Sequence, residues 1–173
     1  MIETERLNLR AWRDADRDPF WAMAQDEDVM RYLLPRSSRE ESDAVVDHLI
    51  AAQEACGHCF WAVERKDDAR FIGFCGLMPA NGPLSEIEIG WRLERVSWGK
   101  GYAREAALAS LDWAWRDTAT PTVVAITVIE NIRSWGLMER LGMRRDPSED
   151  FDHPLLAEGH PLRRHILYRI HRP

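Results

Sequence analysis

A glycine-rich segment, Trp98-Gly99-Lys100-Gly101-Tyr102-Ala103, is the part of the chain whose residue types most directly suggest ligand binding. Small residues at a helix N-terminus let backbone N–H groups approach an anion, the helix dipole adds attraction, and Lys100 supplies further positive charge. The segment is neither a P-loop, because Gly-Lys is not followed by Ser or Thr, nor a dinucleotide fingerprint, because the three-glycine spacing is absent. It predicts phosphate binding, with a tight strand-to-helix turn as the alternative.

A second motif, Cys56-Gly57-His58-Cys59, matches the redox motif of disulfide isomerases. Such a motif needs a helix N-terminus to lower its thiol pKa, whereas this one follows a predicted helix that ends near Ala55, and a helix C-terminus raises the pKa instead. No second Cys/His pair stands at zinc spacing, and three cysteines are too few for a disulfide scaffold. We expect neither redox activity nor a metal site.

Hydrophobic periodicity predicts the elements that must position the glycine-rich loop. The expected order is a strand at 4–13, a helix beginning at Asp18-Pro19 with Asp18 as N-cap, a helix capped by Ser38 and Glu41, a hairpin of strands at 60–65 and 70–78, a strand at 85–94, a helix to about Asp117, a buried strand at 122–129, a helix from Asn131 to Leu141 stopped by Gly142, and a strand at 163–170. The strand, loop, helix and strand from 85 to 129 form a βαβ unit, which favours an α+β or mixed α/β fold.

Length and composition limit the classes of protein. A chain of 173 residues with 45% hydrophobic and 30% charged residues is typical of one soluble globular domain, here residues 1–173. A net charge of −6 disfavours nucleic-acid binding and suits a cationic substrate such as an amine. The N-terminus has no secretory pattern and no apolar run is long enough for a membrane span, so we expect a cytoplasmic protein.

Three motifs together resemble the GNAT N-acetyltransferase superfamily. The glycine-rich loop is similar to its pyrophosphate-binding loop, Gln/Arg-x-x-Gly-x-Gly/Ala, although Trp98 stands where Gln or Arg is usual. The string Trp-Gly-Lys-Gly-Tyr-Ala-x-Glu-Ala and the opening Thr4-Glu5-Arg6-Leu7-Asn8-Leu9-Arg10 resemble the branch with the ribosomal-protein alanine N-acetyltransferases. The third motif is Asn131-x-x-Ser134 followed by Glu139-Arg140-Leu141-Gly142-Met143.

The resemblance implies a fold and a cosubstrate. The expected fold is a twisted, mostly antiparallel sheet of about seven strands flanked by helices, with a splay between the strands at 85–94 and 122–129. Acetyl-CoA would lie in the splay: residues 98–103 would bind its pyrophosphate, backbone groups from Trp91 to Leu93 would pair with pantetheine, and Asn131 would bind the coenzyme. An N–H group near Leu93 would stabilise the oxyanion formed from the thioester.

The leaving thiolate lacks an obvious proton donor. Many members of the family carry a Tyr seven residues after the Asn, whereas this chain has Met138, which cannot donate a proton. Ser134 or a water molecule would take that role, or the thiolate would leave unassisted, since a thiol pKa near ~8.5 makes its departure feasible. Ser134 as a plain helix residue is the alternative.

A base must take the proton of the substrate ammonium group. Glu86 and Glu88 lie two residues apart on the strand beside the expected thioester, and so share a face. Glu88 is the preferred base because it lies closer to Trp91–Leu93, with Glu86 as the second candidate and a merely solvated face as the alternative.

The acceptor is left open between a protein N-terminal amine and a small-molecule amine. Asp152 and His153 lie in a dense polar cluster that could bind an ammonium group, and Tyr32 could line the acceptor pocket; a solvated loop and core packing are the respective alternatives. We expect direct transfer in a ternary complex by a monomer or homodimer. The rival of another class is a non-catalytic acyl-CoA sensor, which the absence of Tyr at 138 favours.

Overall fold

The computed structural model describes residues 1–34, 38–80 and 83–173. In chain order the elements are β1 (Ile2–Glu3), β2 (Leu7–Arg10), the 3-10 turn η1 (Asp14–Asp16), α1 (Arg17–Ala24), α2 (Glu27–Met30), α3 (Arg39–Cys56), β3 (Phe60–Arg65), β4 (Phe71–Pro79), β5 (Ile87–Leu93), η2 (Arg95–Ser97), α4 (Tyr102–Asp117), β6 (Thr122–Thr127), α5 (Ile132–Arg140), β7 (Arg144–Arg145), η3 (Pro147–Glu149), β8 (Phe151–Asp152) and β9 (Arg164–His171).

The strands form one open sheet, which in the described part of the chain has nine members in the order β1-β2-β3-β4-β5-β6-β9-β7, with β8 paired to β9. All pairs are antiparallel except β5 with β6. The predicted mixed fold, the hairpin of β3 and β4 and the βαβ unit of β5, α4 and β6 are confirmed. The expectation of about seven strands was low because β1, β7 and β8 have two residues each, too few to show a pattern.

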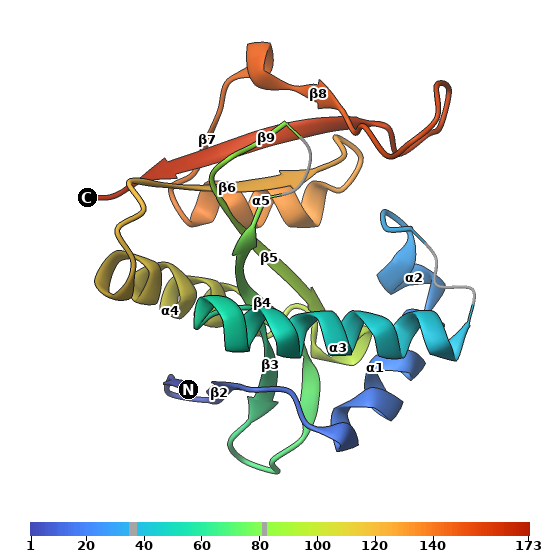
Figure 1. The fold of residues 1–173 in the computed structure, drawn as a ribbon, viewed down its shortest axis with the longest axis vertical. Coiled ribbons are helices and arrows are strands. Elements are labelled where there is room, and N and C mark those ends of the chain that lie inside the picture. Colours follow the sequence, from blue (N-terminus) through green and yellow to red (C-terminus); the bar gives the residue numbers. More distant parts are fainter. Residues whose placement is uncertain (35–37, 81–82) are drawn as a thin grey trace.

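The sheet opens between β5 and β6. Their parallel ladder has two registered pairs, Ile87 with Val123 and Glu88 with Val124, whereas β4 stays paired with β5 as far as Leu93. In Figure 1, β6 and β9 cross the upper part of the molecule while β5 runs diagonally down towards β4. The predicted splay is therefore present, and it begins directly after Glu88.

Helices cover both faces of the lower part of the sheet. Phe20 of α1 contacts the ring of Phe74 with centroids 6.3 Å apart, while the next residue along β4, Cys75, meets Ser110 of α4. Because successive side chains of a strand point to opposite faces, α1 and α4 lie on opposite sides of β4. The glycine-rich loop before α4 and the helix α1 thus lie on opposite sides of β4.

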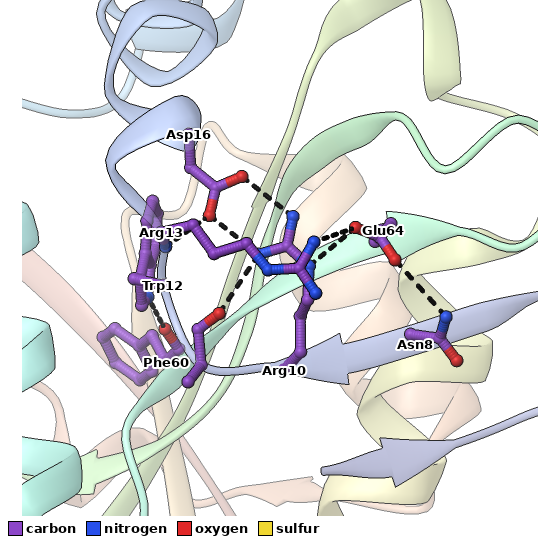
Figure 2. Close-up of polar contacts among 8 residues, drawn as sticks. Asn8, Arg10, Trp12, Arg13, Asp16, Phe60 and Glu64 are labelled. Atoms are coloured by element: carbon purple, nitrogen blue, oxygen red, sulfur yellow. Dashed lines mark hydrogen bonds and ion pairs between the residues drawn. The ribbon is translucent and has the colours of Figure 1, made fainter.

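A buried ion network joins β2, the start of α1 and β3 (Figure 2). Arg10 donates to Asp16 at 2.7 and 2.9 Å and to Glu64 at 2.7 Å, and Arg13 also reaches Glu64. The network explains a wrong prediction: α1 begins at Arg17 after Asp16, and not at Pro19 after Asp18. Arg10 and the backbone N–H of Arg13 hold the Asp16 carboxylate, so the η1 turn leads into the helix two residues early.

Other helix ends follow the sequence. Ser38 caps α3 by accepting from the N–H of Glu41 at 3.2 Å. The helix ends at Cys56, so the cysteine motif lies at a helix C-terminus as predicted, and burial raises the pKa of Cys59 to about 12. The helices in the described ranges include none that is long and apolar enough to cross a membrane.

Candidate functional site

A cavity of about 1440 Å³ occupies the splay. Among the described residues, the lining comes from β5, from the η2–α4 loop with the first turn of α4, from the end of β6 with α5, and from α2 with the residues after it. Phe60 of β3 and Phe74 of β4 also contribute. The lining includes Asp28, Arg31, Tyr32, Phe60, Phe74, Glu88, Trp91, Leu93, Trp98, Gly99, Gly101, Tyr102, Ala103, Arg104, Asn131, Arg133, Ser134, Met138 and Arg140. Of the predicted coenzyme-binding residues, Lys100 is missing from this surface; it is exposed, and its carbonyl accepts from Arg6 at 3.0 Å.

One edge of β5 presents backbone groups to the cavity. Glu86 and Glu94, at either end of the strand, make backbone hydrogen bonds with the β4 side, through Ala80 and Ile72. The alternation of a strand then turns the N–H and C=O groups of Ile89, Trp91 and Leu93 towards β6. Because the β5–β6 ladder ends at Glu88, no strand in the described part of the chain pairs with these groups, and an amide-bearing ligand can pair with them.

The glycine-rich loop is shaped by two left-handed residues. Gly99 and Gly101 have φ angles of +75° and +82°, in a region that residues with a Cβ atom rarely adopt. Gly101 is the N-cap of α4 and provides no side-chain cap. The first N–H groups of α4 therefore remain available to an anion in the cavity.

The N-terminal strand motif, Thr4 to Arg10, stabilises this loop through long-range hydrogen bonds, which local sequence patterns do not reveal. Glu105 in the first turn of α4 accepts from the Thr4 hydroxyl, from the Arg6 N–H at 2.8 Å and from the Arg6 guanidinium at 2.7 Å. Arg6 also lies over the Tyr102 ring at 4.7 Å. Arg6 thereby links the N-terminus to the loop and to α4 over 94 to 99 residues of sequence.

Trp98 and Asn131 both line the cavity, and each is held by a different partner. The Trp98 indole donates to the Leu93 carbonyl at 2.8 Å, which occupies part of the edge predicted for pantetheine. Asn131 donates from its amide nitrogen to Thr127 at 3.0 Å. That bond fixes the Asn131 side chain and leaves its amide oxygen without a partner in the described residues.

Glu88 lies in the cavity on the face of β5 that it shares with Gly90. A Cβ at Gly90 would come within 2.8 Å of the Phe60 ring, and Phe60 stacks on Phe74 with centroids 5.5 Å apart. The carboxylate has no hydrogen bond or ion pair with any residue in the described ranges. Burial without a partner raises the pKa of Glu88 to about 7.

Glu86, the second candidate base, is not brought to the cavity. Its carboxylate accepts from Arg169 of β9 at 2.8 Å. This hydrogen bond is the main reason why the pKa of Glu86 is lowered, and the carboxylate remains ionised and paired. The two carboxylates are only two residues apart in sequence, but they differ chemically because Glu86 pairs with Arg169 and Glu88 has no partner in the described residues.

The part of the cavity lined by α5 contains Ser134 and Met138. Met138 lies on the face of α5 that packs against the hydrophobic core, and it is buried. Ser134 lines the cavity in the first turn of α5, and its hydroxyl has no partner in the described part of the chain. The structure thus places a hydroxyl, and no phenol, on this helix.

The predicted acceptor residues are separated. Tyr32 lines the cavity and also an adjoining hollow of about 470 Å³, together with Leu34, His160, Pro161 and Leu162. Asp152 instead pairs with Arg163 and Arg164, and the His153 ring contacts that of His165 at 5.0 Å. Neither lines either hollow. Metal binding has no candidate group of three or more His, Cys, Asp and Glu among the described residues.

Comparison with known proteins places these features in a family context. A family model described as an acetyltransferase (GNAT) domain matches residues 6–144. YkkB of Bacillus subtilis is 30% identical over 144 residues, covering 82% of this chain and 84% of that protein. YnaD of the same organism, named as an N-acetyltransferase, is 29% identical over 84% of this chain and 83% of its own length.

Solved structures share the architecture. An acetyltransferase from Agrobacterium tumefaciens has a TM-score of 0.78 at 31% identity, covering 98% of this chain and 93% of that one. Two others at 19% identity are similar in fold alone. They are the spermidine N-acetyltransferase of Vibrio cholerae in complex with CoA and spermine (TM-score 0.77, covering 98% and 97%) and the ribosomal-protein-S5-alanine acetyltransferase of Vibrio fischeri (TM-score 0.74, covering 98% and 95%).

Proposed function

Since the chain belongs to the GNAT acetyltransferase family, we propose that its 173 residues act as one N-acetyltransferase domain that moves the acetyl group of acetyl-CoA directly to a primary amine, with Glu88 as the general base. The observation that carries the proposal is the Glu88 carboxylate, which has no partner in the described residues and lies in the cavity where the β5–β6 ladder ends. A base with a pKa near the operating pH combines availability with proton affinity.

The cosubstrate would extend along the open edge of β5. Its pyrophosphate would meet the N-terminus of α4 at residues 99–103, and its pantetheine amides would pair with the free edge at Ile89 and Trp91. The Leu93 N–H would stabilise the oxyanion. Asn131 would offer its amide oxygen to a coenzyme N–H group. These roles use backbone groups that the splay leaves open and no metal.

The reaction would proceed in a ternary complex. Glu88 takes a proton from the substrate ammonium group, and the amine nitrogen attacks the thioester carbonyl. The C–S bond then breaks as the C–N bond is completed, and the second proton of the nitrogen passes through Ser134 or water to the thiolate, which leaves a neutral amide and the CoA thiol. Glu88 reaches the cavity from β5 and Ser134 reaches it from α5, so different elements would serve the attack of the amine and the departure of the thiolate.

The acceptor is proposed as a primary amine on a small molecule or a peptide N-terminus. The spermidine and ribosomal-protein enzymes with this fold act on a polyamine and a protein, so the fold leaves both classes open. Tyr32 supports a pocket that continues into the adjoining hollow. Asp152 and His153 receive no support as acceptor ligands, because they line neither hollow.

Glu88→Gln tests the proposal, with Glu86→Gln as the matched control. General-base catalysis contributes about 10²–10⁴-fold, so Glu88→Gln should lower kcat by about 10²-fold or more and remove the acidic limb of the pH–rate profile near pH 7. The affinity for acetyl-CoA should remain. CoA release measured with a panel of peptides and small amines gives the rates. A Glu88→Gln enzyme with wild-type turnover, or the same loss in Glu86→Gln, would refute the assignment.

A further inference from the structure

Among the described residues, six arginines line the cavity in the splay, and their partners divide it into two ends. Arg31 pairs with Asp28 at 2.6 Å, Arg95 pairs with Asp26 at 3.2 Å, and Arg92 lies over the rings of Phe20 and Phe74. Those three are held at the α2 end. The other three, Arg104, Arg133 and Arg140, come from α4 and α5 and have no carboxylate partner within the described ranges.

Guanidinium groups without a carboxylate partner at one end of the cavity favour the binding of an anion there. Each arginine at the α2 end is held by a carboxylate or by aromatic rings, so its charge is already compensated or covered. The α4–α5 end keeps its positive charge in a chain whose net charge is −6. This contrast indicates that the compensating negative charge at that end is supplied by a ligand.

Arg133 is the best placed of the three because its position is fixed. Its guanidinium carbon lies 4.7 Å from the centre of the Trp98 ring. The Trp98 ring is itself fixed by its hydrogen bond to the Leu93 carbonyl. A planar guanidinium resting on an aromatic face is pre-oriented and still has its N–H donors free at the edge.

We propose that Arg133, seated on Trp98, binds a phosphate group of the coenzyme and supplies from α5 the positive charge that the first position of the glycine-rich loop lacks. Trp98 occupies the first position of the loop, where a Gln or Arg side chain would bind the phosphates. Arg133 instead brings its positive charge to the site from α5, on the opposite wall of the splay. The inference rests on the proposed use of acetyl-CoA and assigns a binding residue and its support for that same site.

The test compares binding of CoA, 3′-dephospho-CoA and pantetheine by calorimetry at low ionic strength. Hydrogen bonds to charged groups are strong, but Arg133 is exposed, so Arg133→Gln should weaken CoA binding by about tenfold. Pantetheine, which lacks phosphates, should bind as to the wild type. Arg144→Gln is the matched control, because Arg144 is also exposed and unpaired in the described residues but lies outside the cavity.

The analogues identify which phosphate is bound. A loss that persists with 3′-dephospho-CoA assigns Arg133 to the pyrophosphate, and a loss that disappears assigns it to the 3′-phosphate. Trp98→Leu should reproduce the loss and Trp98→Phe should retain most of the affinity, since Phe keeps a ring face. This rescue distinguishes a positioning role of Trp98 from a general loss of packing.

Three results would overturn the inference: wild-type CoA affinity in Arg133→Gln, an equal loss in Arg144→Gln, or an equal loss for pantetheine. In each case the wild-type protein still binds CoA, so the proposed function stands. If the wild-type protein itself does not bind CoA, the proposed function fails and this inference fails with it.

Discussion

Glu64 and Glu88 are carboxylates on strands of the same sheet, and both are removed from most contact with water, but their surroundings differ. Glu64 is held by Arg10, Arg13 and Asn8 (Figure 2). Burial acts to raise the pKa of Glu64, yet the hydrogen bond and charge of Arg10, with help from Asn8 and Arg13, keep it below its ordinary value. Glu88 has aromatic rings nearby and no partner in the described residues, and burial raises its pKa to about 7.

The difference shows that burial alone does not decide what a carboxylate does. A buried charge with well-placed partners fixes the fold, because removing one partner leaves the other charge uncompensated. A buried carboxylate without a partner is held in a state that costs stability but is ready to take a proton. In this protein the first kind joins β2, α1 and β3, and the second kind lies where the sheet opens.

The largest effect is expected from breaking the paired region. Arg10→Met removes the cation shared by Asp16 and Glu64 and should lower the free energy of unfolding by about 3–5 kcal/mol. Urea unfolding followed by circular dichroism measures this loss. Arg116→Met is the control, because the exposed Arg116–Asp117 pair should contribute at most about 1 kcal/mol. Equal losses in the two variants would show that the buried network contributes no more to the free energy of unfolding than an exposed ion pair.

The next effect concerns the sign of pH dependence. The folded-state pKa of Glu88 is raised above its ordinary value of 4.5 to about 7, so native protein holds a proton that the unfolded chain releases between these pH values. Its contribution to stability therefore falls as pH rises from about 4.5 to 7. Glu64 has the opposite sign: its contribution is present above its ordinary pKa and is lost as pH falls through the lowered value.

Glu88→Gln should therefore become more stable relative to the wild type between pH 5 and pH 8, while losing turnover. Unfolding midpoints of the two proteins at both pH values give the comparison. A difference in stability that does not change with pH would show that Glu88 is ionised in the native state throughout this range, and would contradict its raised pKa.

The sequence predicted the parts of the site that depend on local patterns. The alternation in 85–94, the glycines before α4 and the position of Asn131 each determine local geometry, and all lie at the splay. Contacts between distant segments were not predictable: Glu86 meets Arg169 across 83 residues, and Glu105 meets Arg6 across 99. The pairing of Asp152 with Arg163 and Arg164, away from the cavity, was likewise not predictable, because it depends on how the irregular segment before β9 folds back.

Asn131 has one paired and one unpaired polar group in the same side chain. Its replacement is expected to have a smaller effect than the changes at Arg10 and Glu88. Its amide nitrogen is paired with Thr127, whereas its oxygen has no partner in the described residues. Asn131→Ala should remove one coenzyme hydrogen bond of about 0.5–1.5 kcal/mol and raise the KM for acetyl-CoA several-fold with little change in kcat. Steady-state kinetics with varied acetyl-CoA separates the two parameters. A fall in kcat with unchanged KM would assign Asn131 to the reacting groups instead.

The smallest effect is expected at Ser134, whose hydroxyl is unpaired in the described residues, in contrast to Ser97, which also lines the cavity but donates to Glu94 at 2.8 Å. If Ser134 protonates the leaving thiolate, Ser134→Ala should lower kcat and leave CoA affinity unchanged. A thiol pKa near ~8.5 makes the thiolate a good leaving group, so the loss should be at most about tenfold, well below that of Glu88→Gln. Single-turnover rates isolate the chemical step, and Ser97→Ala is the control whose rate should stay at the wild-type value. Because Met138 offers no proton, an unchanged rate in Ser134→Ala would leave water as the acid and would confine side-chain catalysis to the amine side of the splay.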